Sequence, residues 1–138
     1  TKKMSKSELS DLSRINLTDD NDSIVNKIKK AKTDPLPLPS KVTELKDRPE
    51  AKNLLGIYSS LTNSTLENSV NEFEGKNFSE FKEKLSQVLV EKINPISHEI
   101  KKLINDKGFL DKILLDGNKK ANKVASDKVK KMQEIIGF

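Results

Sequence analysis

Apolar residues recur at spacings of three and four over a long stretch in the second half of the sequence, and this period sets the fold class. An α-helix has 3.6 residues per turn, so such spacing places these side chains on one face of a helix. Pro95 lies inside the pattern, and because proline cannot donate the helical hydrogen bond, we expect a kink or a break between two helices there. The apolar series is Phe78, Phe81, Leu85, Val88, Leu89, Ile96, Ile100 and Leu103.

Shorter helical patterns occupy most of the remaining chain. They are predicted over about 18–32, 47–61 and 64–74, with a capping box from Ser64 to Glu67 and a stop at Gly75. No series of alternating apolar and polar runs predicts a sheet. The sequence therefore predicts an all-α fold, a helical bundle preceded by an irregular arm.

A final helix is predicted from about Lys119 to Ile136, after a turn and cap at residues 116–118. Its apolar residues are expected to face inward: Ala121, Val124, Ala125, Met132, Ile135 and Ile136. Lysines cover the remaining surface: Lys119, Lys120, Lys123, Lys128, Lys130 and Lys131.

The first half of the sequence contains a lysine-rich segment followed directly by a proline-rich one. Lys27, Lys29, Lys30 and Lys32 gather at the far end of the first helical pattern, where cations favour the helix dipole, and we interpret most of them as a solvated helix end. Prolines at positions 35, 37 and 39 then stop the helix and predict a stiff extended connector, with a proline-rich ligand as the less favoured alternative. Residues 40–47 are interpreted as a linker, because they show only a weak pattern of secondary structure.

The charge of the chain favours a polyanionic partner. The formal net charge is +5, with charged residues throughout, and RNA is the natural candidate. The chain has no cysteine, which excludes disulfides, zinc–thiolate sites and cysteine nucleophiles. No apolar run approaches the roughly 20 residues that span a bilayer, and no signal peptide opens the chain, so we expect a cytoplasmic protein without membrane or DNA partners.

A short cationic motif lies almost at the start of the sequence. Lysine ammonium groups bind phosphates as point charges, and serine hydroxyls add neutral donors. Such a loop suits a triphosphate whose leaving pyrophosphate must be stabilised as its charge grows. The motif is Lys3-Met4-Ser5-Lys6-Ser7.

This motif matches the KMSKS signature of class I aminoacyl-tRNA synthetases letter for letter, and later blocks follow it in order. Together they resemble the C-terminal part of a bacterial-type tryptophanyl-tRNA synthetase, and the resemblance covers essentially the whole chain. The tyrosyl-tRNA synthetases share the loop but not the later blocks. The blocks are residues 15–19, 27–34, 48–55, 73–76, 95–96 and 117–125.

The resemblance implies an enzyme that joins tryptophan to ATP, releases pyrophosphate, and passes the tryptophanyl group to tRNA(Trp). Lys3 and Lys6 would be the catalytic residues that hold the β- and γ-phosphates, and Met4, Ser5 and Ser7 would complete the ATP site. ATP would enter as a substrate with Mg²⁺, and neither a protein metal site nor a bound prosthetic group is expected. Residues 1–17 would form the loop and the end of the catalytic domain, and residues 18–138 the helical anticodon-binding domain. The intact enzyme would be a homodimer.

The sequence departs from the family pattern in three respects. Ser7 is followed by Glu8-Leu9 where the family commonly has an acid and a proline. The Rossmann catalytic domain and a HIGH-like motif are absent, and the chain begins at Thr1, so we expect a fragment without activation activity of its own. His98, the single histidine, lies inside a predicted helix and is interpreted as structural or surface, not catalytic.

Two alternatives remain open at this stage. One is a basic helical RNA-binding module in which the KMSKS match is accidental. The other is a helical scaffold that binds a protein partner. Neither alternative accounts for the ordered blocks after the loop.

Overall fold

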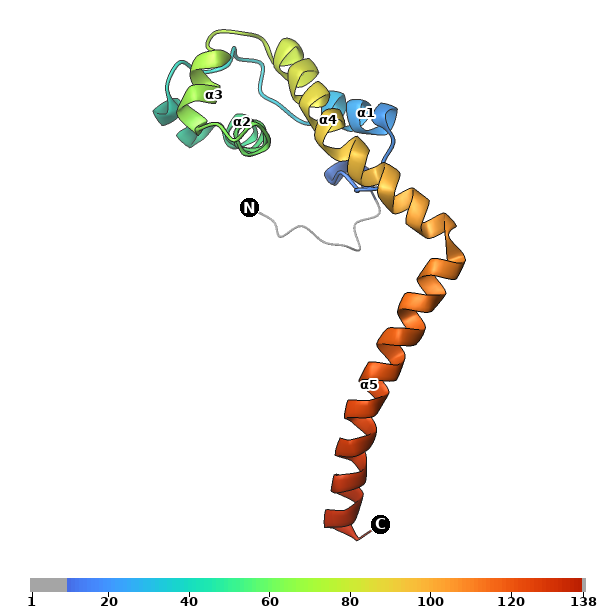
Figure 1. Ribbon diagram of the computed structural model, residues 1–138. Helices are drawn as coiled ribbons and strands as arrows, with labels where there is room; N and C mark the ends of the chain where they lie inside the picture. The colour runs from blue at the N-terminus through green and yellow to red at the C-terminus, as the bar shows by residue number, and fades with distance from the viewer. Residues whose placement is uncertain (1–9, 138) are drawn as a thin grey trace. The chain divides into compact units, whose positions relative to one another are not determined.

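The computed structural model describes residues 10–137, and within this range it is helical and contains no strand (Figure 1). This confirms the all-α prediction. The chain divides into two compact units, with the boundary between His98 and Glu99. The elements are η1 (Asp11–Ser13), α1 (Asn21–Lys30), η2 (Val42–Asp47), α2 (Pro49–Thr62), α3 (Leu66–Glu72), α4 (Phe78–Asn105) and α5 (Lys107–Ile136).

The first unit has one hydrophobic core, built by α1, α2, α3 and the first half of α4. Helices α2 and α3 lie side by side, and α1 lies alongside α4 (Figure 1). Tyr58, Phe73 and Phe81 stack edge to face, with ring centroids 4.8 to 6.0 Å apart. Such contacts let a chain with few aromatic residues bury large surfaces at one point. The fully buried core residues include Ile24, Leu45, Leu55, Val70, Phe81 and Leu85.

The caps of the helices follow the local sequence closely. Asp20 caps α1 by accepting a hydrogen bond from the Ser23 backbone N–H at 2.7 Å, a role that aspartate favours. Asn77 caps α4 and also donates to Glu80 at 2.8 Å. The cap of α3 is Thr65, which accepts from Asn68 N–H at 3.1 Å, so the prediction of Ser64 is wrong by one residue. Because the left-handed Asn63 ends α2 just before, Thr65 is the residue with extended backbone at which a new helix begins.

The proline segment is a connector that packs on the core. Leu38 is buried, its N–H donates to Lys76 O at 2.9 Å, and its carbonyl accepts from Gly75 N–H at 3.1 Å. Gly75 has a φ of +70°, which glycine adopts without strain. The weak linker predicted over 40–47 is instead the 3-10 helix η2, which buries Leu45.

Arg48 joins this connector to the start of α2. Its guanidinium binds both oxygens of Asp34, at 2.7 and 3.0 Å, and the carbonyls of Pro37 and Leu36, at 2.7 and 3.1 Å. The same group lies 5.8 Å from the Phe78 ring centroid. One planar cation therefore fixes three positions of a segment that has no helical hydrogen bonds of its own.

Helix α4 is continuous through Pro95, so of the two predicted alternatives, a kink or a break, the break is wrong. Proline removes a single N–H donor, and the helical bonds on either side persist. Pro95 is exposed, so its ring meets no packed neighbour that would force the helix apart.

Helix α5, in the second unit, also differs from the prediction. It runs without interruption from the cap at Asp106 to Gly137, which ends it with a φ of +82°. The predicted turn at residues 116–118 is therefore wrong, because Gly117 costs only about 1 kcal/mol inside a helix. No residue of α5 is buried, so the predicted inward-facing residues Ala121, Val124, Ala125, Met132, Ile135 and Ile136 are exposed.

Replacing Arg48 by methionine should lower the free energy of unfolding of the chain by about 2–3 kcal/mol, because Asp34 and two carbonyls lose a charged donor. Urea denaturation followed by circular dichroism measures this change. Lys52→Met, at an exposed position of α2, is the matched control. Equal losses in the two variants would contradict the role assigned to Arg48.

Candidate functional site

The motif residues Lys3, Met4, Ser5, Lys6 and Ser7 lie outside the described residues. The segment that follows them, residues 10–19, is described and leads directly into α1. This segment is the part of the described chain that lies nearest to the motif in sequence.

The Asp11 carboxylate is the centre of this segment. It accepts hydrogen bonds from Asn16 Nδ2 at 3.0 and 3.1 Å and pairs with Arg14 Nε at 3.0 Å. Lys27, two turns along α1, reaches the same carboxylate with its ammonium at 2.5 Å. A residue close behind the motif is thus tied to a helix of the core.

Asp19 is the second carboxylate bound by Lys27, at 2.6 Å. It also accepts from the Asn16 backbone N–H at 2.9 Å, and its own carbonyl accepts from Ser97 Oγ at 3.4 Å. These contacts tie the segment to both α1 and α4. We call Asp11, Asn16, Asp19 and Lys27 the anchor cluster.

Lys27 is the exception to the interpretation of most of the lysines near the end of α1 as a solvated helix end. Its side chain is only 8% exposed. A lysine can be withdrawn from water in this way only when carboxylates compensate its charge. Lys29, Lys30 and Lys32 are exposed, as expected.

The charges of the anchor cluster stabilise one another. Hydrogen bonds from Lys27 and then Asn16 lower the pKa of Asp11 from 3.8 to about 2. Burial opposes ionisation of Asp19, but the bonds from Lys27 and Asn16 outweigh it and hold its pKa below the usual value. Burial likewise opposes the charge of Lys27, yet its two carboxylate partners raise its pKa overall.

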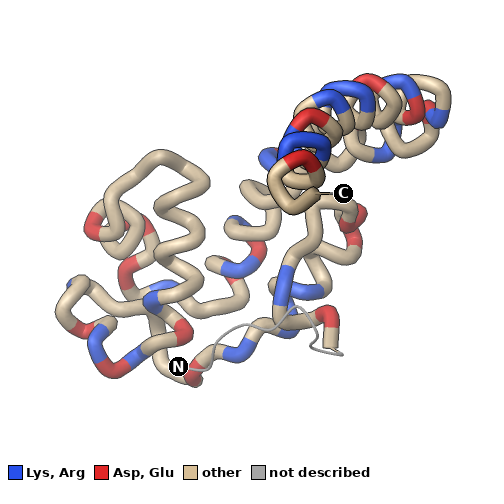
Figure 2. The backbone as a smooth tube through the Cα atoms, turned by 90° about the horizontal axis from the view of Figure 1, so that it is seen from below, with Lys and Arg blue, Asp and Glu red and all other residues tan. Residues whose placement is uncertain are grey.

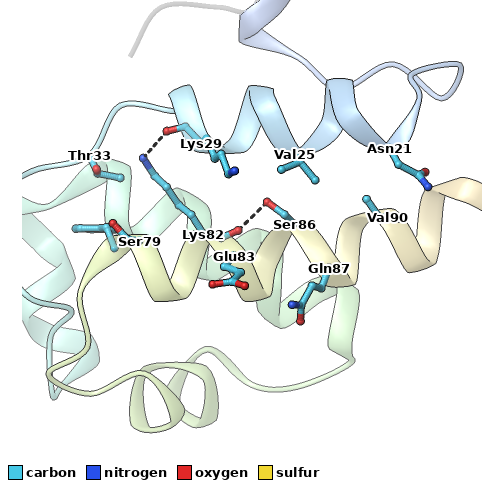
Figure 3. A pocket seen from close by; sticks show the side chains of 11 residues that line it. Asn21, Val25, Lys29, Thr33, Ser79, Lys82, Glu83, Ser86, Gln87 and Val90 are labelled. Atoms are coloured by element: carbon cyan, nitrogen blue, oxygen red, sulfur yellow. Dashed lines mark hydrogen bonds between the residues drawn. The ribbon is translucent and has the colours of Figure 1, made fainter.

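A groove of about 850 Å³ runs between α1 and α4 (Figure 3). Val25, Phe78 and Val90 give it an apolar lining, and Asn21 and Gln87 contribute amides. The Lys82 ammonium donates to the carbonyls of Ala31, at 2.6 Å, and Lys29, at 3.2 Å. Burial lowers the pKa of Lys82. Its charge interacts with the carboxyl end of α1 and is therefore not available to a ligand in the groove.

The lysines of α5 are exposed, including Lys119, Lys120 and Lys123. Acidic residues are interspersed with them along the helix (Figure 2). Because both charge signs occur along it, the helix as a whole is not a single cationic face.

His98 is exposed on α4, in agreement with its interpretation as a surface residue. Residues 10–137 contain no group of three or more acidic or histidine side chains placed to hold a metal ion. In the same range, no helix has the length and hydrophobicity needed to cross a membrane.

Comparison with known proteins assigns the family. The sequence matches the family described as tRNA synthetases class I (W and Y) over residues 1–96, which includes the KMSKS motif and the whole anchor cluster. The chain therefore belongs to this family.

The chain is also similar to individual members of this family. The chain is 50% identical over 138 residues to the tryptophan–tRNA ligase of Rhizobium meliloti and 47% identical to that of Brucella melitensis biotype 1. It is 49% identical over 137 residues to the tryptophan–tRNA ligase of Rickettsia felis. These alignments cover 99 to 100% of this chain but only 39 to 41% of the relatives, so the chain spans about two fifths of their length.

The lowered pKa of Asp11 predicts how stability responds to acid. A carboxyl group whose pKa is lower in the folded state stabilises that state above its unfolded pKa of 3.8 and loses this contribution as the pH falls towards about 2. The urea midpoint of the wild type should therefore fall further between about pH 5 and pH 2.5 than that of Asp11→Asn. Glu91→Gln, at an exposed site on α4, should follow the wild type. Parallel curves for wild type and Asp11→Asn would show that Asp11 is not stabilised in this way.

Proposed function

We propose that the complete protein is a tryptophan–tRNA ligase, to which this chain contributes the ATP-binding loop and a helical tRNA-binding part. The observation that carries the proposal is 47 to 50% identity to tryptophan–tRNA ligases over all 138 residues, together with an intact KMSKS motif. The complete synthetase, by which we mean the polypeptide that joins these residues to the portion found in the relatives, would work in the cytoplasm as a homodimer.

The first reaction joins tryptophan to ATP. The tryptophan carboxylate attacks the α-phosphorus, tryptophanyl-adenylate forms, and the bond to pyrophosphate breaks. Negative charge grows on the departing pyrophosphate, and Lys3 and Lys6 offset it more strongly in the transition state than in bound ATP. Lys6 is the stronger candidate, because Ser5 and Ser7 place hydroxyl donors on both sides of it. Met4 anchors the loop by apolar contact, and Mg²⁺ accompanies the nucleotide.

The second reaction transfers the tryptophanyl group to the 3′-terminal ribose of tRNA(Trp). The helical part, residues 18–138, is proposed to hold the tRNA. Its exposed lysines on α5 suit the phosphate backbone, and contacts of this kind give affinity that falls with salt but no choice of sequence.

The central test is tryptophan-dependent exchange between ATP and pyrophosphate. The complete synthetase should catalyse it, whereas residues 1–138 alone should not. A complete protein that exchanges with neither tryptophan nor tyrosine would refute the proposed function and leave a basic helical module.

In the complete synthetase, Lys6→Ala should lower kcat for exchange by about 10²-fold or more, because a charge that acts on the transition state is lost. The affinity for tryptophan, measured by equilibrium binding, should stay within about twofold of the wild type. Lys41→Ala removes an exposed lysine outside the motif and serves as the control. Equal losses of rate and of tryptophan affinity would exclude the transition-state role.

Neutralising Lys119, Lys120 and Lys123 together should weaken tRNA(Trp) binding. The slope of log affinity against log salt concentration should become shallower by about 2, because two to three phosphate contacts are lost. The same change at Lys41, Lys46 and Lys52, which are exposed in the first unit, keeps the net charge of the variants equal. If both triple variants have the same slope, α5 does not contact the backbone.

A further inference from the structure

We propose that Lys27 is a positioning residue for the ATP-binding loop, since its bonds to Asp11 and Asp19 fix the point from which the motif extends. This inference rests on the proposed function and adds to it a residue on α1, outside the motif. Lys27 touches neither ATP nor tryptophan in this role and acts only through the segment it holds.

The first step is the attachment of Asp11 to the core. Asn16 and Arg14 also contact its carboxylate, but both belong to the same irregular segment, residues 10–19. Within the described residues, Lys27 is the one α-helical side chain bonded to Asp11. Removing the Lys27 ammonium therefore leaves this carboxylate without a direct bond to an α-helix.

The second step is the rigidity of the attachment. Lys27 is almost fully buried on the same helix as Ile24 and Ile28, which are core residues. Its second carboxylate, Asp19, is bonded to Asn16 N–H and through its carbonyl to Ser97 of α4. The ammonium has little freedom to follow Asp11, so Asp11 must remain where the helices place Lys27.

The third step is chain length. Lys6 precedes Asp11 by five residues, so its Cα cannot lie farther than about 18 Å from that of Asp11. Without this attachment, the next residue packed on the core is Ile15, nine residues from Lys6, and the limit becomes about 32 Å. The effective concentration of a tethered group falls roughly as the −3/2 power of tether length, which gives about a 2.5-fold loss before any loss of orientation. Misplacement of the Lys6 ammonium would lower the rate further.

The experiment compares Lys27→Met with Lys82→Met in the complete synthetase. Both lysines are at least partly withdrawn from water and make charged hydrogen bonds. Lys82 donates its bonds to the carbonyls at the carboxyl end of α1, and Lys27 donates its bonds to the carboxylates of residues 10–19. Exchange is measured at saturating ATP well below the midpoint of thermal unfolding of each variant. Lys27→Met should lower kcat by about threefold to tenfold with an unchanged KM for tryptophan, and Lys82→Met should leave kcat unchanged.

Three further variants keep the test independent of folding. Asp11→Asn, at a half-exposed site, should lower kcat in the same direction, and the double variant with Lys27→Met should lose little more than Lys27→Met alone. Lys27→Arg keeps the cation and should restore most of the rate. A fall in kcat for Lys27→Met no larger than that for Lys82→Met, or additive effects of Lys27→Met and Asp11→Asn, would overturn the positioning role. An inactive wild type would instead refute the proposed function itself.

Discussion

The first unit depends on charged hydrogen bonds between two largely buried cations, Lys27 and Arg48, and the irregular segments of the chain. The helices bury their apolar stripes around Phe81, but residues 10–19 and 33–39 lie outside the α-helices and need other contacts to hold them. Lys27 binds the first of these segments and Arg48 the second, each through charged hydrogen bonds of 2.5 to 3.1 Å. Charged hydrogen bonds are stronger than neutral ones, and removing one partner leaves the other buried without a partner, which destabilises the fold. Two side chains thus determine where the connectors lie.

The helices were largely predictable because local sequence specifies them. Asp20 and Asn77, residue types that favour the N-cap, cap α1 and α4, and Gly75 and Gly137 follow helix ends. The errors arose where a weak local signal competes with many helical bonds. One proline at 95 and one glycine at 117 do not break helices of 28 and 30 residues, because each removes little compared with the bonds on either side.

The role of Lys27 was not predictable, for a different reason. Its burial depends on two carboxylates that are 8 and 16 positions away and that approach only when the preceding segment folds back. In the sequence it is one lysine among several at a helix end. Arg48 presents the same difficulty, since Asp34 precedes it by 14 residues. The motif residues themselves were recognisable from sequence alone, because five fixed letters need no tertiary contact to be read.

The backbone pairing of Leu38 with Gly75 and Lys76 has a consequence for the dynamics of the first unit. It brings together two points 37 residues apart and encloses η2, α2 and α3 between them. A segment closed at its ends and packed internally tends to open as one cooperative unit in native-state amide hydrogen exchange. The amides of α2 and α3 should then share a single opening free energy. The anchor cluster lies outside this closed segment, so its bonds can open without opening α2 and α3.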